Sequence, residues 1–302
     1  MNARQNNYIY NDETLMDMRK FCILFIPLFT ISVIYAQNQR FTYEYSFKMD
    51  SLNRESVEKE IMYLDVTNSG SKFYSALLLT RDSLFSAELE KGKRSQSIEI
   101  DLRKIRRPKV NFKVSKRYPD LETVYHTSLN ASNLALKEMN RMHWIISSET
   151  KDIEGFKAQK AQTTFGGRRW TAWFTNDIQL QDGPYKFCGL PGLILHVEDD
   201  KGDHVFRLIG SQKMDVMPEL LDSKINEIFV TKQKFGQLWK EYKNDPAKNI
   251  KQMHSSSELS DTIIYDYDKN PLTKQELIRR KEQRAKEVFK KMNNFIELDL
   301  YK

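Results

Sequence analysis

"GPYKFCGLPGLILHVEDD", residues 183–200, sets two turn-forming pairs around a cysteine and a run of apolar residues. Within it, Leu190–Leu193 predicts a type II turn, because Pro191 presets φ and Gly192 accepts a positive φ. The hexapeptide Gly189–Ile194 contains no serine, histidine or carboxylate, so it cannot itself supply a nucleophile and its base. It has no phosphate-loop spacing either. We therefore interpret the stretch as a structural bend that leads into a strand.

Alternating patterns on both sides of this bend predict antiparallel strands. In the segment 169–175 the apolar residues at every second position share one face, and the segment 193–197 repeats this pattern. Further alternation in Phe41–Phe47 predicts a strand near the N-terminus. The sequence therefore predicts a β-rich α+β fold, a curved antiparallel meander whose signature region spans residues 144–211.

Two segments predict helices. Leu134–Met142 is rich in helix formers and predicts one or two turns. Near the C-terminus, Thr273 and Glu276 have capping-box spacing at the start of an amphipathic pattern. We expect a helix over 273–294, packed on or beside the sheet. Its face is strongly basic, which indicates either a solvated surface or attraction to anionic lipid.

The N-terminus resembles a secretory signal peptide. Arg19 and Lys20 precede the apolar run Phe21–Tyr35, which ends at Ala36. This run is shorter than a membrane span, although an uncleaved anchor is the alternative. We expect cleavage near Ala36, with residues 37–302 as a single exported domain that has no further membrane span. The upstream extension leaves three candidate starts, Met1, Met16 and Met18.

Composition narrows the classes of site. The chain carries a formal net charge of +7, with 40% hydrophobic and 12% aromatic residues, which suits a protein with a substantial core. After cleavage Cys188 is the one remaining cysteine, so no internal disulfide, CxxC redox site or zinc ribbon is expected. Export makes nucleic acid a poor partner. No cofactor is expected, and Cys188 is interpreted as a small buried residue rather than a nucleophile.

Aromatic residues of the signature region are the candidate binding residues: Trp170, Trp173, Tyr185 and Phe187. Since Trp170 and Trp173 fall on opposite strand faces, we expect them to be core residues or the lining of a hydrophobic pocket. A second set has a structural role in forming the bend. These residues are Gly183, Pro184, Gly189, Leu190, Pro191, Gly192, Leu193 and Ile194.

Two histidines suggest a weaker alternative. If the hairpin centres on residues 200–201, His196 and His204 face each other across two strands and could bind a divalent metal. A register slip of one residue would separate them. A hydrolase or metal-dependent enzyme could use this pair, or carboxylates such as Asp177 and Asp182.

The hexapeptide Gly189–Ile194 resembles the signature of the GLPGLI family of exported bacterial proteins. The resemblance is dense over the second half of the chain, and it includes the segment Gly183–Phe187 and the closing residues Asn293, Asn294 and Ile296–Leu298. It implies a leader and a place in the envelope of a Gram-negative cell, with no established activity. Phe295 stands where the family usually has proline.

Two functions follow as hypotheses. The first is a non-enzymatic envelope module that binds or carries an apolar, lipid-like ligand or a partner protein. The second is the hydrolase or metal enzyme described above. The signature residues are mainly aromatic, aliphatic, glycine and proline, which favours the first.

Overall fold

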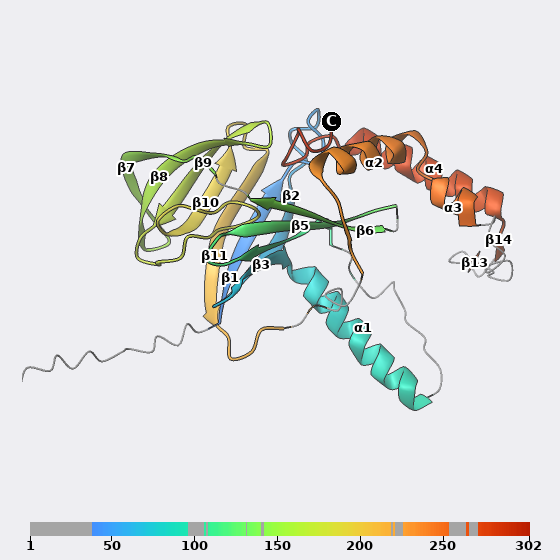
Figure 1. Ribbon diagram of the computed structural model, residues 1–302, viewed down its shortest axis with the longest axis horizontal. Coiled ribbons are helices and arrows are strands. Elements are labelled where there is room, and N and C mark those ends of the chain that lie inside the picture. The colour runs from blue at the N-terminus through green and yellow to red at the C-terminus, as the bar shows by residue number, and fades with distance from the viewer. Residues whose placement is uncertain are drawn as a thin grey trace, which may run out of the picture. The chain divides into compact units, whose positions relative to one another are not determined.

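One sheet of twelve strands dominates the protein, whose structure is a computed structural model (Figure 1). The structure describes residues 38–95, 106, 108–130, 132–139, 142–218, 220, 226–253, 264–265 and 271–302. The predicted leader, its cleavage near Ala36 and the three candidate starts lie outside these residues. Among the described residues, no helix combines the length and the apolar character that a membrane span requires.

The strand order is β12-β6-β5-β4-β3-β2-β1-β11-β10-β9-β8-β7. The strand bounds are β1 Gln39–Phe47, β2 Glu58–Thr67, β3 Gly70–Ser75, β4 Lys113–Arg117, β5 Glu122–Leu129, β6 Ser132–Met139, β7 Ile145–Ile153, β8 Phe156–Phe165, β9 Arg168–Thr175, β10 Leu193–Asp199, β11 His204–Lys213 and β12 Ile228–Phe229. Neighbouring strands are antiparallel except β12 and β6, which are parallel. The predicted β-rich fold with a curved antiparallel sheet is confirmed, and a short parallel pair adds to one edge.

Strand β1 joins two meanders: the first runs from β2 to β6, and the second runs from β7 to β11. It pairs with β2 on one side and with β11 on the other. Its alternation places Phe41, Tyr43, Tyr45 and Phe47 in the core, each less than a tenth exposed. Because β1 lies between two neighbours, both of its hydrogen-bonding edges are paired. Its aromatic side chains all point to one face of the sheet, and they form the middle of the core.

The sheet curves enough for side chains of one meander to contact backbone and loop groups of the other. Ser71 lies on β3 and donates a 2.6 Å hydrogen bond to Asp182, in the loop between β9 and β10. Tyr43 of β1 donates to the carbonyl of Ile194 on β10, at 2.7 Å. The loop that carries the signature therefore fills the inside of the curved sheet and contacts both meanders.

The expected helix over Leu134–Met142 is wrong. Residues 134–139 belong to β6, which pairs with β5 along its whole length. Leu134, Ala135 and Leu136 are all buried there, so burial and pairing override the helix preference of the sequence. A helix that the strand patterns did not indicate, α1 (Ala76–Ser95), follows β3 directly.

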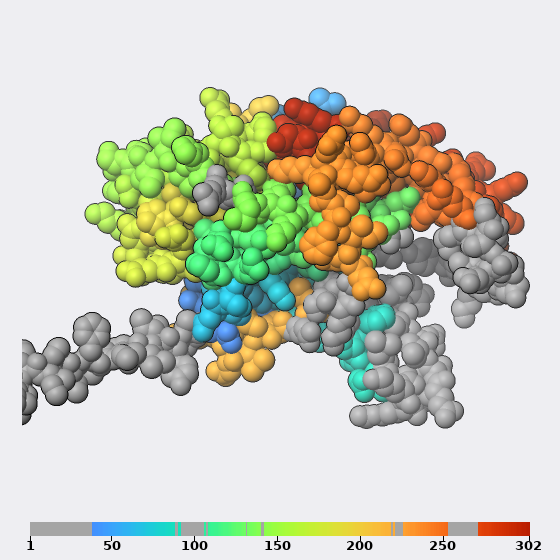
Figure 2. Space-filling model, viewed as in Figure 1, coloured from blue at the N-terminus to red at the C-terminus, as the bar shows by residue number. Residues whose placement is uncertain are grey.

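The predicted C-terminal helix is confirmed as α4 (Lys274–Lys291). Thr273 caps it, and Glu276 completes the predicted capping box. Two further helices precede it, α2 (Lys232–Asn244) and α3 (Lys248–Met253), and a two-stranded ribbon joins β13 (Ile264–Tyr265) to β14 (Pro271–Leu272). Phe289 of α4 packs edge-on against Trp239 of α2, with ring centroids 5.6 Å apart. Helix α4 thus packs beside α2, and Figure 2 shows these helices in orange and red next to the green strands.

The predicted type II turn at Leu190–Leu193 is also wrong. Gly192 does not have the positive φ that such a turn needs, whereas Gly189 has φ +89°. Glycine is needed at 192 for space: a Cβ there would lie 1.9 Å from the carbonyl oxygen of Thr175. The bend exists, but close backbone packing against the end of β9 determines it.

Candidate functional site

Phe187 stands at the centre of the folded signature loop. It is completely buried, and its ring meets Trp170 at 4.6 Å and Phe165 at 5.7 Å between centroids. Both are T-shaped contacts, the arrangement that aromatic quadrupoles favour. The loop residues therefore belong to the core rather than to an exposed catalytic loop.

Asp182 fastens this loop to the first meander. Its carboxylate accepts hydrogen bonds from Ser71 at 2.6 Å, from the hydroxyl of Tyr118 at 2.5 Å and from the ammonium of Lys116. The backbone N–H of Gly183 donates to it at 2.6 Å. Because the carboxylate is completely buried and accepts four hydrogen bonds, Asp182 holds the loop against β3 and β4.

A second buried network joins the loop to the C-terminal segment. The ammonium of Lys186 lies 2.5 Å from Glu297 and 3.0 Å from Glu138. Tyr185 donates a 2.6 Å hydrogen bond to the same Glu297 carboxylate. Lys232 of α2 lies 3.7 Å from its other oxygen. A buried charge is tolerated when it is paired in this way.

Arg168, at the start of β9, holds the segment before Glu297. Its guanidinium donates to Asp199 at 2.9 Å, to the side chain of Asn294 at 2.6 Å and to the carbonyl of Phe295 at 2.7 Å. The planar group satisfies three acceptors from different parts of the chain. Residues 294–297 are thereby fixed against the second meander.

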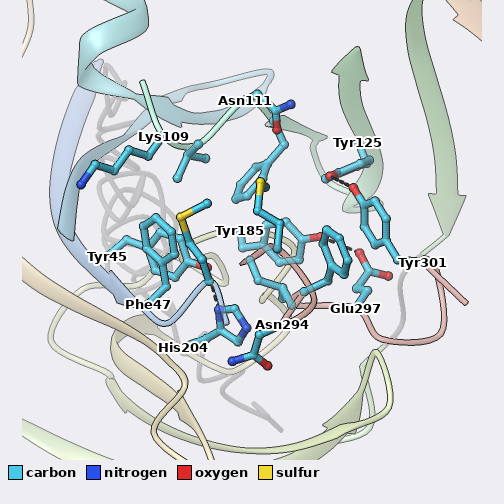
Figure 3. A pocket seen from close by; sticks show the side chains of 16 residues that line it. Tyr45, Phe47, Lys109, Asn111, Tyr125, Tyr185, His204, Asn294, Glu297 and Tyr301 are labelled. Atoms are coloured by element: carbon cyan, nitrogen blue, oxygen red, sulfur yellow. Dashed lines mark hydrogen bonds between the residues drawn. The ribbon is translucent and has the colours of Figure 1, made fainter. Parts of the chain in front are cut away.

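These contacts leave a cavity between β1 and the C-terminal segment (Figure 3). Its volume is about 90 Å³. It is lined mainly by aromatic and aliphatic side chains, and Lys109 and Asn111 lie on the opposite side from Glu297 in the view of Figure 3. The lining residues are Tyr45, Phe47, Met49, Lys109, Val110, Asn111, Phe112, Tyr125, Tyr185, His204, Met292, Asn294, Phe295, Ile296, Glu297 and Tyr301.

His204 and Tyr45 are two of the polar residues in the cavity wall. Nδ1 of His204 is 2.7 Å from the hydroxyl of Tyr45, and its Nε2 is buried without a hydrogen-bond partner. Burial, together with the charge of Arg168, lowers the pKa of His204 to about 3. Burial also raises the pKa of Tyr45 and of Tyr185. At neutral pH the imidazole and both phenols are uncharged, so this part of the wall suits an apolar guest.

The four predicted binding aromatics are all buried, each 5% exposed or less. Tyr185 lines the cavity, whereas Trp170, Trp173 and Phe187 do not. Trp173 lies on the outer face of its strand, where the ammonium of Lys151 covers it at 3.9 Å from the ring centroid. Trp170 and Phe187 are packing residues of the core.

The predicted pairing of His196 with His204 does not form. In the register of β10 and β11, His196 faces Arg207, and His204 pairs with Phe47 on β1. The hairpin therefore centres further along the chain than residues 200–201, and the two rings lie on opposite faces of the sheet.

Within the described residues no group of three or more metal-ligating side chains forms. Asp177 is exposed, and Asp182 is committed to Lys116.

Cys188 is 1% exposed, and burial raises the pKa of its thiol to about 11. A thiol with that pKa is almost entirely protonated at neutral pH and is a poor nucleophile. The backbone carbonyl of Cys188 accepts a 2.8 Å hydrogen bond from the indole N–H of Trp144.

Sequence reasoning missed most of the cavity wall. The segments 109–112 and 292–301 lie far apart in the sequence, and neither has a period or spacing that indicates a pocket. The aromatic alternation of β1 gave one usable signal, since Tyr45 and Phe47 are adjacent on one face.

Comparisons with known proteins find a family model that is similar to part of the signature region. A family model described as "Protein of unknown function (Porph_ging)" matches residues 167–196, a short segment that includes the hexapeptide Gly189–Ile194. The GLPGLI name rests on the sequence resemblance and is not the name of this family model. No curated protein matches the chain.

Two solved structures are similar at low identity. They are described as "Structure of PNGF-II in P21 space group" and "Structure of PNGF-II in C2 space group". Both are 15% identical, and they cover 67% and 65% of this chain with TM-scores of 0.47 and 0.44. The matched part is 33% and 31% of those chains, so this chain spans about a third of their length.

Proposed function

We propose that this is an exported envelope protein that binds an apolar group of a partner protein in the cavity between β1 and residues 292–301. The observation that carries the proposal is the aromatic cavity itself, with a neutral imidazole and phenols in its wall. Apolar cavities with a few placed polar groups are the usual form of a binding site.

Cavity size separates the two predicted kinds of guest. Pockets that hold a whole small ligand usually measure roughly 300–1,000 Å³. The cavity here measures about 90 Å³, which is closer to the space that one apolar side chain fills. This supports a partner segment that inserts a single aromatic or branched aliphatic residue, in preference to an enclosed lipid-like ligand.

Export is the second part of the proposal, and the N-terminal sequence supports it. Expression of the complete chain in a Gram-negative host should release a periplasmic protein whose first residue is close to Gln37. Mass spectrometry of the mature protein measures this directly. A periplasmic product that still contains the run Phe21–Tyr35 would instead favour the uncleaved anchor.

Methionine methyl groups give a local probe of the cavity. Met49 and Met292 line it, whereas Met139 lies on β6 and is 57% exposed. With ¹³C-methyl methionine, NMR titration with toluene, indole and short peptides that carry one phenylalanine or leucine should shift the first two signals saturably. The Met139 signal should not move.

Filling the cavity provides the matched test. Met292→Trp should abolish the saturable shift at Met49, because the larger side chain occupies the site, and Met139→Trp should leave it unchanged. If a long-chain fatty acid binds far more tightly than any peptide, the partner-segment proposal fails and a lipid carrier replaces it. If no apolar probe moves either signal in the folded protein, the cavity is not a binding site.

A further inference from the structure

A serine, a histidine and a glutamate lie in line on the outer face of the first meander. The hydroxyl oxygen of Ser115 on β4 is 2.5 Å from Nε2 of His126 on β5. Nδ1 of His126 is 2.8 Å and 2.9 Å from the two carboxylate oxygens of Glu227, just before β12. Three separate parts of the chain therefore supply one connected chain of hydrogen bonds.

The carboxylate determines where the imidazole proton lies. An ionised Glu227 can accept but not donate a hydrogen bond, so Nδ1 of His126 must carry the proton that joins them. In the neutral ring Nε2 is then the acceptor, and the hydroxyl of Ser115 donates to it. This is the tautomer in which a histidine takes a proton from a serine hydroxyl.

All three side chains lie outside the core. Val114 and Lys116 point inward from β4, and Ser115 between them points to the outer face. The side chains of His126 and Glu227 are 18% and 20% exposed. Ser115 lines a depression of about 320 Å³ with Lys72 and Val124, and His126 lines a second one of about 260 Å³ with Glu227. Depressions of this size approach the volume of a small-ligand site.

Two lysines share the face with the serine. Lys72 on β3 is the register partner of Ser115, and Lys113 on β4 is the register partner of His126. Side chains that face each other across a sheet stand close together. Their positive charges would stabilise an oxyanion and would favour a substrate with a negative group.

We propose that Ser115, His126 and Glu227 form a hydrolytic site for small esters that carry an anionic group. Oγ of Ser115 attacks the ester carbonyl carbon while its proton passes to Nε2 of His126. The C–O bond to the alcohol then breaks, and the alcohol leaves with that proton. A water molecule attacks the acyl-serine in the same way, and the acid is released as the serine is restored.

Glu227 acts here as a positioning residue, since it holds the ring and does not reach the reacting atoms. The same contacts could instead serve to tie the segment before β12 to the sheet. That structural role predicts a loss of stability on substitution but no chemical reactivity of Ser115. Reactivity of the serine is therefore the readout that separates the two.

The test uses the full protein and a fluorophosphonate probe, which forms a Ser O–P bond and releases fluoride. Intact mass and peptide mapping should show one adduct, on Ser115. S115A should abolish labelling, and S128A, which removes another serine of the same face, should not. H126Q and E227Q should each slow labelling at least tenfold, and E227D should recover part of the rate.

Ester hydrolysis gives the second measurement. The p-nitrophenyl ester of a monosuccinate should be cleaved faster than p-nitrophenyl acetate, and Lys72→Gln should reduce that preference. A folded wild-type protein that neither labels at Ser115 nor cleaves either ester would overturn the proposal. So would equal labelling of the folded S115A variant. Ser115, His126 and Glu227 are not among the residues that line the cavity of the proposed function, so Met292→Trp should not affect labelling of Ser115.

Discussion

The ammonium of Lys186 lies 2.5 Å from Oε1 of Glu297, and both side chains are completely buried. One belongs to the loop between β9 and β10, the other to the segment after α4. Lys186 lies in the segment Gly183–Phe187 and Glu297 in the segment Ile296–Leu298, and both segments resemble the GLPGLI signature family. The pair, with Tyr185 beside it, closes the core by fixing the C-terminal segment inside the curved sheet.

Removing one partner of this pair should be costly. Lys186→Met leaves the buried carboxylate of Glu297 with only the more distant ammonium of Lys232, at 3.7 Å, and we expect the free energy of unfolding to fall by about 3 kcal/mol. Urea unfolding monitored by tryptophan fluorescence measures this change.

The double variant Lys186→Met, Glu297→Leu is the control. It removes both charges, so its loss of stability should be smaller than the sum of the two single losses. Additive losses would mean that the two side chains do not interact in the folded protein.

Glycine substitutions test the close packing of the bend. Gly192→Ala should destabilise the protein by several kcal/mol, since its Cβ would overlap the carbonyl oxygen of Thr175. Gly189→Ala should cost about 1–2 kcal/mol, because space is open there but φ is positive. Thermal and urea unfolding give both values.

Two further substitutions serve as references for this series. Gly210→Ala should change little, because that position has neither a close neighbour nor a positive φ. Cys188→Ala should cost less than Gly192→Val. If Gly192→Ala unfolds like wild type, the bend is not held by its contact with Thr175.

His204 should make stability depend on pH. Its pKa falls from 6.5 to about 3 on folding, so the unfolded chain binds more protons between these values. The contribution of His204 is therefore present above the unfolded pKa and is lost as pH falls towards about 3. At about pH 5 the loss is about 2 kcal/mol.

His204→Gln should remove this part of the dependence. Unfolding free energies at about pH 7.5 and about pH 5 should differ less in the variant than in wild type. The same difference in both proteins would show that the imidazole is not buried in its neutral form.

The strands were predictable where period-two alternation coincides with burial. Phe41 to Phe47 and Trp170 to Phe174 show this, because each sends its aromatic side to one core. Leu134 to Leu136 was not predictable, since three consecutive buried residues have no period that separates a strand from a helix.

The site residues were harder to predict because they depend on contacts between distant segments. Glu297 and His204 line one cavity, and Ser115 is linked to Glu227 through His126. Local sequence carries no signal for such pairs. The bend at 190–193 was recognised from its turn residues, but the reason for Gly192 depends on the position of Thr175.

The central place of β1 affects the order of folding. This strand leaves the ribosome before its neighbours, yet β11, its partner on one side, is synthesised only after nine other strands. Closing so long a loop costs chain entropy before any contact compensates for it. Each meander can form from strands that are close in sequence. The pairing of β1 with β11 joins residues that are far apart in sequence, so it should be the slow step of folding. Until β11 pairs with it, one hydrogen-bonding edge of β1 stays unpaired, and other chains or chaperones can bind to that edge and to its aromatic side chains.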